Sequence, residues 1–541
     1  MLANILGLAL LGAGVVASAF QVTLGNTSAP VVNLVYAQYQ GSFNATSNIT
    51  SFLNISYAAP PVGSLRFQAP QPPLNISGFQ QATSWPDMCP QADFGASNTS
   101  PVPVYGIAKR SLPTPAASED CLYLNVWTPG TLESATNRSE GGYPVLVWIH
   151  GGGYVQEYSA MYNGADIVLD GDNGVVVVVI QYRLGLFGFL AGSEMKERAA
   201  LNAGLLDQQY ALKWVQENIA AFGGDPSHVT IWGESAGAGS VLQHIVANGG
   251  NTQPPLFHAG ITSSTFLPSQ YAYNHRVPEY LYSQVVTEAG CASSTDTFAC
   301  LQHADVNLLE QANQNVMLSG FYGTYLFVPV VDGEFITDRP SVLLEEGKVN
   351  GDLLLAFGNA DEGYLFVDQN ETMLFPEYIA NVFPDMTAEM VDIASQIYDG
   401  YGTPVEQATL AMGDSIFVCP TYYLMDAFVG RTWKGIFAIP PAYHGQDCIY
   451  YFNANPPPYD NAVFIKAFSQ SFLSVARSYD VNVKFDPSNI TPYWQQHFVG
   501  NFEMLFNRTE DYQPVVEPVK TDPSLLRRCA FWQSVTSMTA Q

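Results

Sequence analysis

The sequence predicts an α/β fold in which a mostly parallel central sheet is flanked by helices, and two observations lead to this prediction. Five short runs are apolar at every position, and they occupy residues 144–149, 175–180, 229–232, 353–357 and 435–439. Uninterrupted apolar runs suit strands that are buried on both faces of a parallel sheet. Longer segments with helical character separate these runs, which is the alternation expected of an α/β domain.

One helix is expected immediately before the third run. Residues 201–222 place apolar side chains at roughly helical spacing, and Gly223 and Gly224 form a stop signal after them. The strand is then expected to begin after Asp225 and Pro226.

Two longer stretches, residues 270–345 and 376–430, carry helix-like patterns with little strand signal, so we expect helical insertions that cap the sheet. No Pro/Ser-rich linker interrupts the chain, and no internal repeat is visible. Residues 20–541 are therefore predicted to form a single domain.

The chain begins with MLANILGLALLGAGVVASAF, an apolar run that ends in Ala-Ser-Ala before the Phe. This pattern is typical of a signal peptide, here residues 1–19, although no Lys or Arg precedes the run. A membrane anchor is the alternative, which the short, small-residue-rich run disfavours. Sequons for N-glycosylation lie at Asn26, Asn44, Asn48, Asn54, Asn75, Asn98, Asn137, Asn370, Asn489 and Asn507. We therefore expect a secreted, extracellular glycoprotein without a stable membrane anchor.

The formal net charge is −28, from 20 Lys and Arg against 48 Asp and Glu. Such a charge repels nucleic acid and anionic membranes, so nucleic-acid binding is excluded. The seven cysteines show no C-x-x-C spacing, so we expect no metal site, and we expect no cofactor. In an oxidising compartment they allow up to three disulfides with one cysteine left over. The sequence predicts no particular oligomeric state.

The segment VTIWGESAGAGS places Ser235 between Gly233 and Gly237, directly after the third apolar run. The pattern G-x-S-x-G is common by chance, but a strand before it and a helix after it predict a sharp strand-to-helix turn. Small neighbours relieve the clash in such a turn, and the helix start offers N–H groups to a developing oxyanion. Ser235 is therefore predicted to be a nucleophile for attack on a carbonyl.

The segment HGGGY at residues 150–154 follows the first apolar run. Glycines let backbone N–H groups approach a substrate oxygen without a side chain in the way. A plain glycine turn is the alternative. Because the turn at Ser235 is also present, we expect the N–H groups of Gly152, Gly153 and Ala236 to form an oxyanion hole.

A serine nucleophile needs a histidine base and a carboxylate that orients the histidine, and in this layout the chain order is Ser, acid, His. Two histidines follow the fourth apolar run, and they are His444 and His497. His444 lies just beyond the fifth run beside Gly445, whereas PYWQQHFVGNFEML predicts an amphipathic helix in which His497 packs or faces solvent. Glu362 follows a strand directly, and its neighbour Asp361 is expected to point elsewhere. We therefore predict Glu362 as the acid and His444 as the base.

Two segments resemble the signature motifs of type-B carboxylesterases, the family that contains cholinesterases, fungal lipases and the non-enzymatic neuroligins. They are EDCLYLNVWTP at residues 119–129 and FGGDPSHVTIWGESAG at residues 222–237. The similarity extends through YAAPPVGSLRFQAP, QYRLGLFGFL, NAGLLDQQYALKWVQENI and VDGEF, and it covers nearly the whole mature chain. The resemblance, strongest to secreted fungal esterases and lipases, implies an α/β-hydrolase fold with Ser235, Glu362 and His444 as the catalytic triad.

The resemblance also implies two disulfides, Cys89–Cys121 and Cys291–Cys300. The first encloses a loop that acts as a lid in related lipases. Of the remaining cysteines, we expect Cys419 to pair with Cys448.

The sequence departs from the family at two places. Cholinesterases carry a Trp inside the first disulfide loop that holds a quaternary ammonium, but no Trp lies between Cys89 and Cys121, so choline esters are not expected. Ser264 is followed by Thr265 where relatives have glycine. We still expect Ser264 to support the site by a hydrogen bond near His444.

The sequence therefore predicts a serine hydrolase that cleaves small-molecule or lipid carboxylic esters through an acyl-enzyme. A lipase for long-chain acylglycerols competes with an esterase for feruloyl-type aromatic esters. Residues 90–120, where a lid is expected, show no strongly amphipathic helix, which favours an esterase. A non-catalytic binding protein like the neuroligins is the remote alternative, and the presence of Ser235 with an acid and a base argues against it.

Overall fold

The computed structural model describes residues 29–99, 116–139, 141–370, 372–428, 430–453 and 456–541. The predicted signal peptide (residues 1–19), the sequon at Asn26 and most of the expected lid therefore lie outside the described residues.

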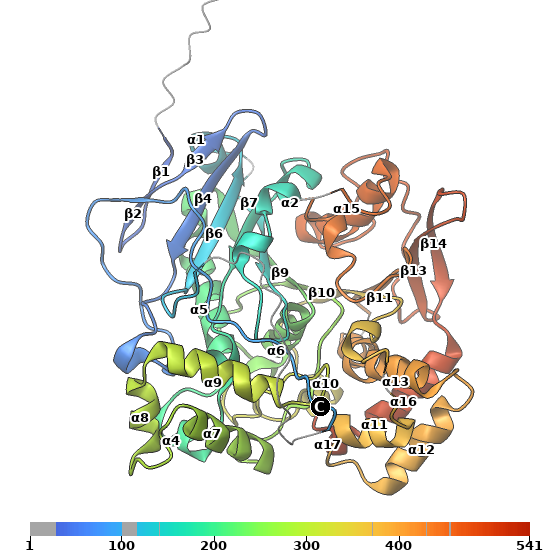
Figure 1. Ribbon diagram of the computed structural model, residues 1–541. Coiled ribbons are helices and arrows are strands. Elements are labelled where there is room, and N and C mark those ends of the chain that lie inside the picture. Colours follow the sequence, from blue (N-terminus) through green and yellow to red (C-terminus); the bar gives the residue numbers. More distant parts are fainter. Residues whose placement is uncertain (1–28, 100–115, 140, 371, 429, 454–455) are drawn as a thin grey trace, which may run out of the picture.

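The core of the molecule is an 11-stranded sheet (Figure 1). In spatial order its strands are β14 (Pro514–Lys520), β13 (Phe502–Arg508), β12 (Thr432–Phe437), β11 (Leu353–Asn359), β10 (Ala259–Ser263), β9 (Gly224–Glu234), β7 (Tyr143–Ile149), β8 (Val176–Ile180), β6 (Tyr123–Pro129), β4 (Ile49–Ser56) and β3 (Ser42–Asn44). The neighbours from β8 to β13 pair in parallel, and the pairs at both edges are antiparallel. All five apolar runs lie in this sheet, so the predicted α/β layout is confirmed.

Both faces of the sheet are buried, because successive residues of a strand point to opposite sides. In β7, Val145, Val147 and Ile149 pack in one apolar core. Leu146 and Trp148 pack in the other. All five residues from Val145 to Ile149 are buried, which explains why the run shows no polar alternation.

Helices cover both faces. α5 (Ala203–Asn218) and α6 (Ala236–Gly250) contribute to the first core, whereas α2 (Gly164–Asp170) and α15 (Ala462–Ser478) contribute to the second. α6 begins two residues after β9 ends, and only Ser235 separates the two elements.

The end of α5 differs in detail from the prediction. A 3-10 turn over Ile219–Phe222 leads to Gly223 in the left-handed conformation (φ 84°), so the predicted stop is present. β9 begins at Gly224 rather than after Pro226.

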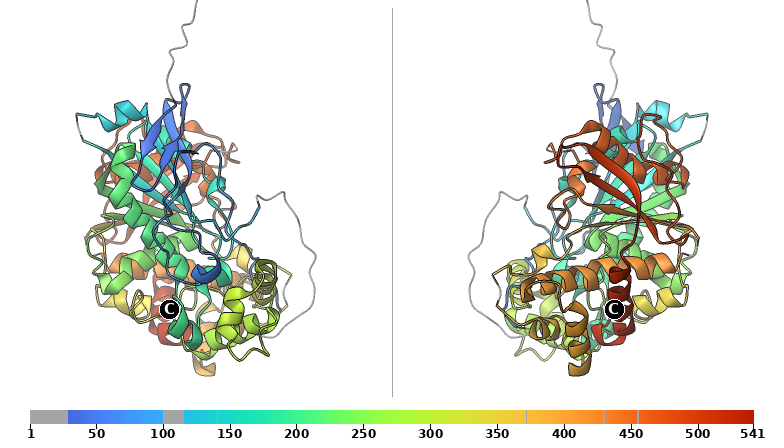
Figure 2. Two further views of the ribbon diagram at one scale, coloured as in Figure 1. Left: turned by 90° about the vertical axis from the view of Figure 1, so that its left-hand side faces the viewer. Right: turned by 90° about the vertical axis from the view of Figure 1, so that its right-hand side faces the viewer.

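The two predicted helical insertions are present, and Figures 1 and 2 show them gathered at one end of the molecule. The first holds α7 (Arg276–Glu288), α8 (Thr297–His303), α9 (Val306–Leu318) and α10 (Pro340–Glu345). The second holds α11 (Phe375–Val382), α12 (Ala388–Tyr398), α13 (Pro404–Gly413), a π-helical turn (Asp414–Val418) and α14 (Cys419–Asp426).

Shorter elements complete the fold. They are the helices α1 (Leu132–Thr136), α3 (Gly185–Phe189), α4 (Ser193–Arg198), α16 (Pro523–Ser534) and α17 (Thr536–Thr539), and a small sheet of β1 (Val31–Asn33), β2 (Gln38–Gln40) and β5 (Phe79–Gln81). Among the residues described, no helix is both long and apolar enough to cross a bilayer.

Three disulfides tie the chain together, and they are Cys89–Cys121, Cys291–Cys300 and Cys419–Cys529. The first two are those that the resemblance implies. The expected Cys419–Cys448 pairing is wrong, because α14 and α16 pack together and bring Cys529 to Cys419. Cys448 keeps a free thiol.

Two further expectations need correction. The helix predicted around His497 does not form, because residues 490–496 have no regular structure and a turn follows. His497 is buried instead, and its Nε2 lies 3.3 Å from Thr521 Oγ1. Asn489 is only 7% exposed and its amide donates to Gln470 Oε1 (3.2 Å), so a glycan does not fit there in the folded chain.

Candidate active site

Ser235 occupies a sharp turn between β9 and α6. Its backbone has φ 56° and ψ −124°, a conformation that non-glycine residues rarely adopt and that costs energy. The Ser235 N–H donates to Ser263 O (2.9 Å), and the Gly239 N–H donates to Ser235 O (2.8 Å). These bonds hold the strained residue at the N-terminus of a buried helix.

The glycines beside Ser235 are required by close backbone contacts. A Cβ on Gly233 would lie 2.3 Å from the carbonyl carbon of Gly237, and a Cβ on Gly237 would lie 2.0 Å from Ile149 O. Both distances are far shorter than van der Waals contact. The small residues in GESAG therefore allow β7, β9 and α6 to meet closely enough to form the turn.

The loop after β7 approaches the same turn. Gly152 and Gly153 both have positive φ, 82° and 61°. A Cβ on Gly151 would lie 3.1 Å from Ser235 Cβ, so this loop runs directly beside the serine. Ala236 is the first residue of α6. Of the predicted oxyanion donors, Ala236 therefore adjoins Ser235 in the chain, and Gly152 and Gly153 belong to the loop that passes beside it.

His150 begins this loop and has a structural role. Its ring stacks on Tyr182 with the centroids 4.5 Å apart, and the Tyr182 hydroxyl donates to His150 O (2.9 Å). Burial lowers the pKa of His150 to about 4. The ring is therefore neutral near pH 7 and helps to fix the loop.

Glu362 and His444 come from the loops that follow the neighbouring strands β11 and β12. The Asp361 N–H donates to Ala442 O (3.0 Å), which draws the two loops together. His444 Nδ1 lies 2.6 Å from Glu362 Oε2. On the other side of the ring, His444 Nε2 lies 3.3 Å from Glu234 Oε1.

A buried polar network holds the Glu362 carboxylate in place. Glu362 Oε1 accepts hydrogen bonds from the Asn359 N–H (2.6 Å) and from Ser264 Oγ (2.7 Å). The Asn359 amide donates to Ser264 Oγ (3.1 Å) and to Asp447 Oδ1 (3.0 Å). Ser264 therefore contacts the acid rather than the histidine. Asn359 and Asp447 were not predicted from the sequence, although each lies three residues from a predicted site residue.

Two aromatic rings pack against His444. The Phe417 ring lies 4.4 Å from the imidazole and the Phe366 ring lies 5.0 Å from it, measured between centroids. Phe417 belongs to the π-helical turn between α13 and α14. Such turns are frequent at functional sites because the extra residue re-aims a side chain.

Ser235, His444 and Gly152 line one cavity of about 400 Å³, which we call the catalytic cavity. Its wall also carries two carboxyl groups that the sequence analysis missed, Glu157 and Glu234. Burial, followed by the nearby carboxyls of Glu157, Asp447 and Glu362, raises the pKa of Glu234 well above its ordinary value.

Burial likewise raises the pKa of Glu157, although the Tyr162 hydroxyl, the Gly151 N–H and His444 act in the opposite direction. We call Glu157 and Glu234 together the acid wall. The sequence carries a signal for only one of them, since Glu234 stands next to Ser235.

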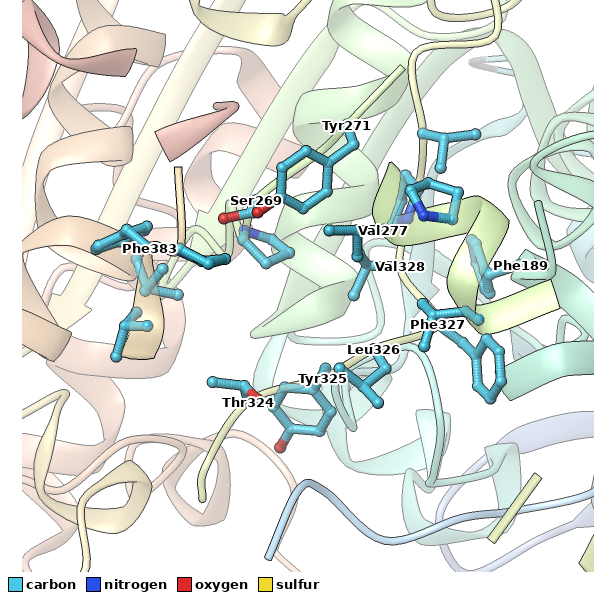
Figure 3. Close-up of a pocket in the computed structure, with 18 of the residues that line it drawn as sticks. Phe189, Ser269, Tyr271, Val277, Thr324, Tyr325, Leu326, Phe327, Val328 and Phe383 are labelled. Carbon is cyan, nitrogen blue, oxygen red and sulfur yellow. The ribbon is translucent and has the colours of Figure 1, made fainter. Parts of the chain in front are cut away.

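A second cavity of about 330 Å³ adjoins the first, and Tyr325 and Phe366 line both. We call it the apolar cavity, because carbon-rich side chains such as Phe189, Val277 and Phe327 dominate its lining. In Figure 3, Ser269 and Tyr271 lie across this cavity from Thr324 and Tyr325.

Tyr325 also touches the predicted oxyanion loop. A Cβ on Gly153 would lie 2.0 Å from the Tyr325 ring, so only glycine fits beneath this ring. Tyr325 therefore stands where the oxyanion loop, the catalytic cavity and the apolar cavity meet.

Comparison with known proteins finds a family model, similar sequences and a similar structure that each cover most of the chain. Residues 28–494 match the model of the family described as "Carboxylesterase family". The chain is 30% identical to carboxylesterase patB of Penicillium expansum over 94% of this chain and 96% of that protein. It is also 30% identical to secreted lipase 1 of Botryotinia fuckeliana, over 90% and 88% of the two chains. The crystal structure of EstA from Aspergillus niger superposes with a TM-score of 0.83 at 29% identity, covering 95% of this chain and 99% of EstA.

Proposed function

This chain belongs to the carboxylesterase family and is a carboxylic-ester hydrolase with the α/β-hydrolase fold, and we propose that it acts through an acyl-enzyme on Ser235. Ser235 Oγ attacks the carbonyl carbon while His444 Nε2 takes its proton, and His444 then gives the proton to the leaving alcohol. The same histidine activates the water that hydrolyses the acyl-enzyme. Glu362 orients the imidazole and stabilises its charged form.

One observation carries this proposal. The 2.6 Å contact between His444 Nδ1 and Glu362 Oε2 fixes the orientation of the imidazole ring. Ser235 lines the same cavity as that ring. An oriented histidine in the same cavity as a strained serine is the arrangement that general-base catalysis needs, and the bond to the serine often forms only when substrate binds.

Gly152, Gly153 and Ala236 are proposed as the donors of the oxyanion hole. Backbone N–H groups beside the nucleophile stabilise the charge that develops on the carbonyl oxygen, and they need no rearrangement during the reaction. The positive φ of both glycines and the position of Ala236 at the start of α6 support this assignment.

The apolar cavity is the proposed site of the acyl chain. It adjoins the catalytic cavity through Tyr325 and Phe366, and apolar walls favour a hydrocarbon over a polar group. This feature also fits the alternative of a lipase that acts on long-chain acylglycerols. Activity on one triglyceride below and above its solubility limit separates the two, because a jump at the interface favours the lipase.

Secretion is part of the proposal. Three disulfides favour an oxidising compartment, and one relative is itself named a secreted lipase. Release of the protein into the medium, with a mature N-terminus after Ala19, would support this localisation.

The test of the proposed function is Ser235→Ala on para-nitrophenyl butyrate. We expect kcat to fall by about a thousandfold or more, because the nucleophile is lost while the other groups remain. Ser227→Ala, at an exposed serine of the same strand, is the matched control and should keep full activity. Substantial activity of a folded Ser235→Ala protein would contradict the assignment.

A further inference from the structure

The proposed base lies in a short turn that begins at Tyr443. The Gln446 N–H donates to Tyr443 O (3.0 Å), and the Tyr443 N–H donates to Gln446 Oε1 (3.1 Å). These bonds close a four-residue turn that contains His444 and Gly445. Ala442, just before the turn, has a left-handed backbone with φ 57°, which a residue with a side chain keeps only where its surroundings hold it. Contacts made by Tyr443 therefore bear directly on the position of the imidazole.

The Tyr443 side chain makes such a contact with the segment that carries the acid. Its ring stacks on the ring of Tyr364, with the centroids 4.3 Å apart and 11° between the planes. Tyr364 begins the 3-10 turn Tyr364–Phe366, two residues after Glu362. Aromatic pairs of this kind contribute more than the burial of their surface. The stack therefore joins the acid segment to the turn that holds the base.

The stack lies away from the catalytic cavity. Tyr364 and Tyr443 are both half-buried, and neither is among the described residues that line that cavity. His444, the next residue after Tyr443, does line it. The two segments are thus joined at the cavity by the bond between His444 and Glu362, and away from it by the two tyrosine rings.

This arrangement matters because proton transfer depends on accurate placement. A single hydrogen bond fixes one distance between the acid and the base, but it leaves the two segments free to pivot about that bond. A second contact at another point removes this freedom. A displacement of about 1 Å at a catalytic group can cost a hundredfold in rate, even when the mutation lies outside the site.

We propose that Tyr364 and Tyr443 are positioning residues, whose stack fixes the turn at His444 relative to Glu362. This inference rests on the proposed function, because it takes His444 as the base and Glu362 as the acid. The stack acts on the proton-transfer step and not on the binding of the ester. It should therefore raise kcat and leave KM nearly unchanged.

Tyr364→Leu and Tyr443→Leu test the proposal, because leucine keeps an apolar side chain and abolishes the stack. On para-nitrophenyl butyrate we expect kcat of each variant to fall by about tenfold, with KM within about twofold of the wild-type value. Tyr364→Phe and Tyr443→Phe keep both rings and should restore kcat to the wild-type level. A purely structural defect would not be rescued so selectively.

The double variant Tyr364→Leu/Tyr443→Leu shows whether the two rings act as one unit. Once the first leucine has abolished the stack, the second has nothing further to remove. We therefore expect kcat of the double variant to fall by about tenfold, as in each single variant, and not by the product of the two losses.

Tyr479→Leu is the matched control. The Tyr479 ring stacks on His228 with the centroids 4.1 Å apart, and this pair joins the end of α15 to β9 seven residues before Ser235. Loss of this stack should lower the thermal stability and leave kcat unchanged.

Active sites are counted by the nitrophenol released from an alkylphosphonate para-nitrophenyl ester, so unfolded protein does not lower the measured kcat. Thermal unfolding identifies a variant that fails to fold, and the other leucine variant then carries the test. If neither folds, Tyr364→Met replaces them, because its flexible side chain fills irregular gaps without forming a stack.

The outcomes are distinguishable. If the leucine variants keep kcat within about twofold of the wild-type value, or if their losses multiply in the double variant, the positioning role is wrong and the proposed function stands. A higher KM at unchanged kcat would also overturn the proposal, because the rings would then act in substrate binding. If Ser235→Ala hydrolyses the ester as fast as the wild-type protein, the proposed function itself fails.

Discussion

The apolar cavity and the acid wall lie close to the proposed nucleophile, and they differ in chemistry. The apolar cavity is built largely by the helical insertions and the segment that contains Tyr325. An apolar cavity gains affinity for a hydrocarbon chain in small steps, since each buried methylene contributes about 0.8 kcal/mol to the free energy of binding. The acid wall is built by the loop after β7 and by the end of β9. At such a wall, each buried polar group that is left without a hydrogen bond costs about 1–3 kcal/mol. The insertions therefore shape the apolar cavity, whereas the buried carboxyl groups lie on segments next to the proposed catalytic residues.

The largest effect is expected at the place where the two regions meet. Gly153→Ala adds a Cβ that would lie 2.0 Å from the Tyr325 ring, at a positive φ that alanine disfavours. Because the oxyanion loop must shift, we expect kcat to fall by about a hundredfold for every ester. Gly290→Ala has a similar φ of 72° with nothing near the added Cβ, so it controls for backbone strain alone. An equal loss in both variants would remove Gly153 from the oxyanion hole.

A smaller effect is expected on the acyl side alone. Tyr325→Ala removes the ring shared by the two cavities, so the chain-length optimum should move to longer acyl groups, with a gain of about tenfold for the longer chain relative to butyrate. Tyr325→Phe keeps the ring and should keep the wild-type profile. Initial rates on para-nitrophenyl esters of increasing chain length measure the profile. An unchanged profile for Tyr325→Ala would show that the acyl chain does not enter the apolar cavity.

The parts of the fold predicted from the sequence are those with strong local patterns. The strands β7, β8, β9, β11 and β12 each contain a short, largely apolar run, which identifies them. β10 was missed because AGITS holds one large apolar residue, and its strand character depends on pairing with β9 and β11. The helix predicted around His497 was wrong because apolar residues at helical spacing pack there without forming a helix.

In the candidate site too, residues with a local sequence signal could be predicted, whereas residues placed by tertiary contacts could not. Ser235, Glu362 and His444 could be proposed from the sequence because each lies in the turn or loop after a strand, and chain order selected among the alternatives. Glu157 carries no such signal, since its place at the cavity depends on a left-handed backbone and on Tyr162. The pairing of Cys419 with Cys529 depends on how α14 and α16 pack, which spacing along the chain does not contain.

The central claim is that Ser235 is the residue that becomes acylated. An alkylphosphonate para-nitrophenyl ester tests it directly, because it reacts with the nucleophile and is not turned over. After inactivation, peptide mass spectrometry locates the adduct. We predict a single phosphonyl group on Ser235, with one equivalent of nitrophenol released per protein and no reaction of Ser235→Ala. An adduct on another residue, or stoichiometric labelling of the Ser235→Ala protein with release of nitrophenol, would contradict the claim.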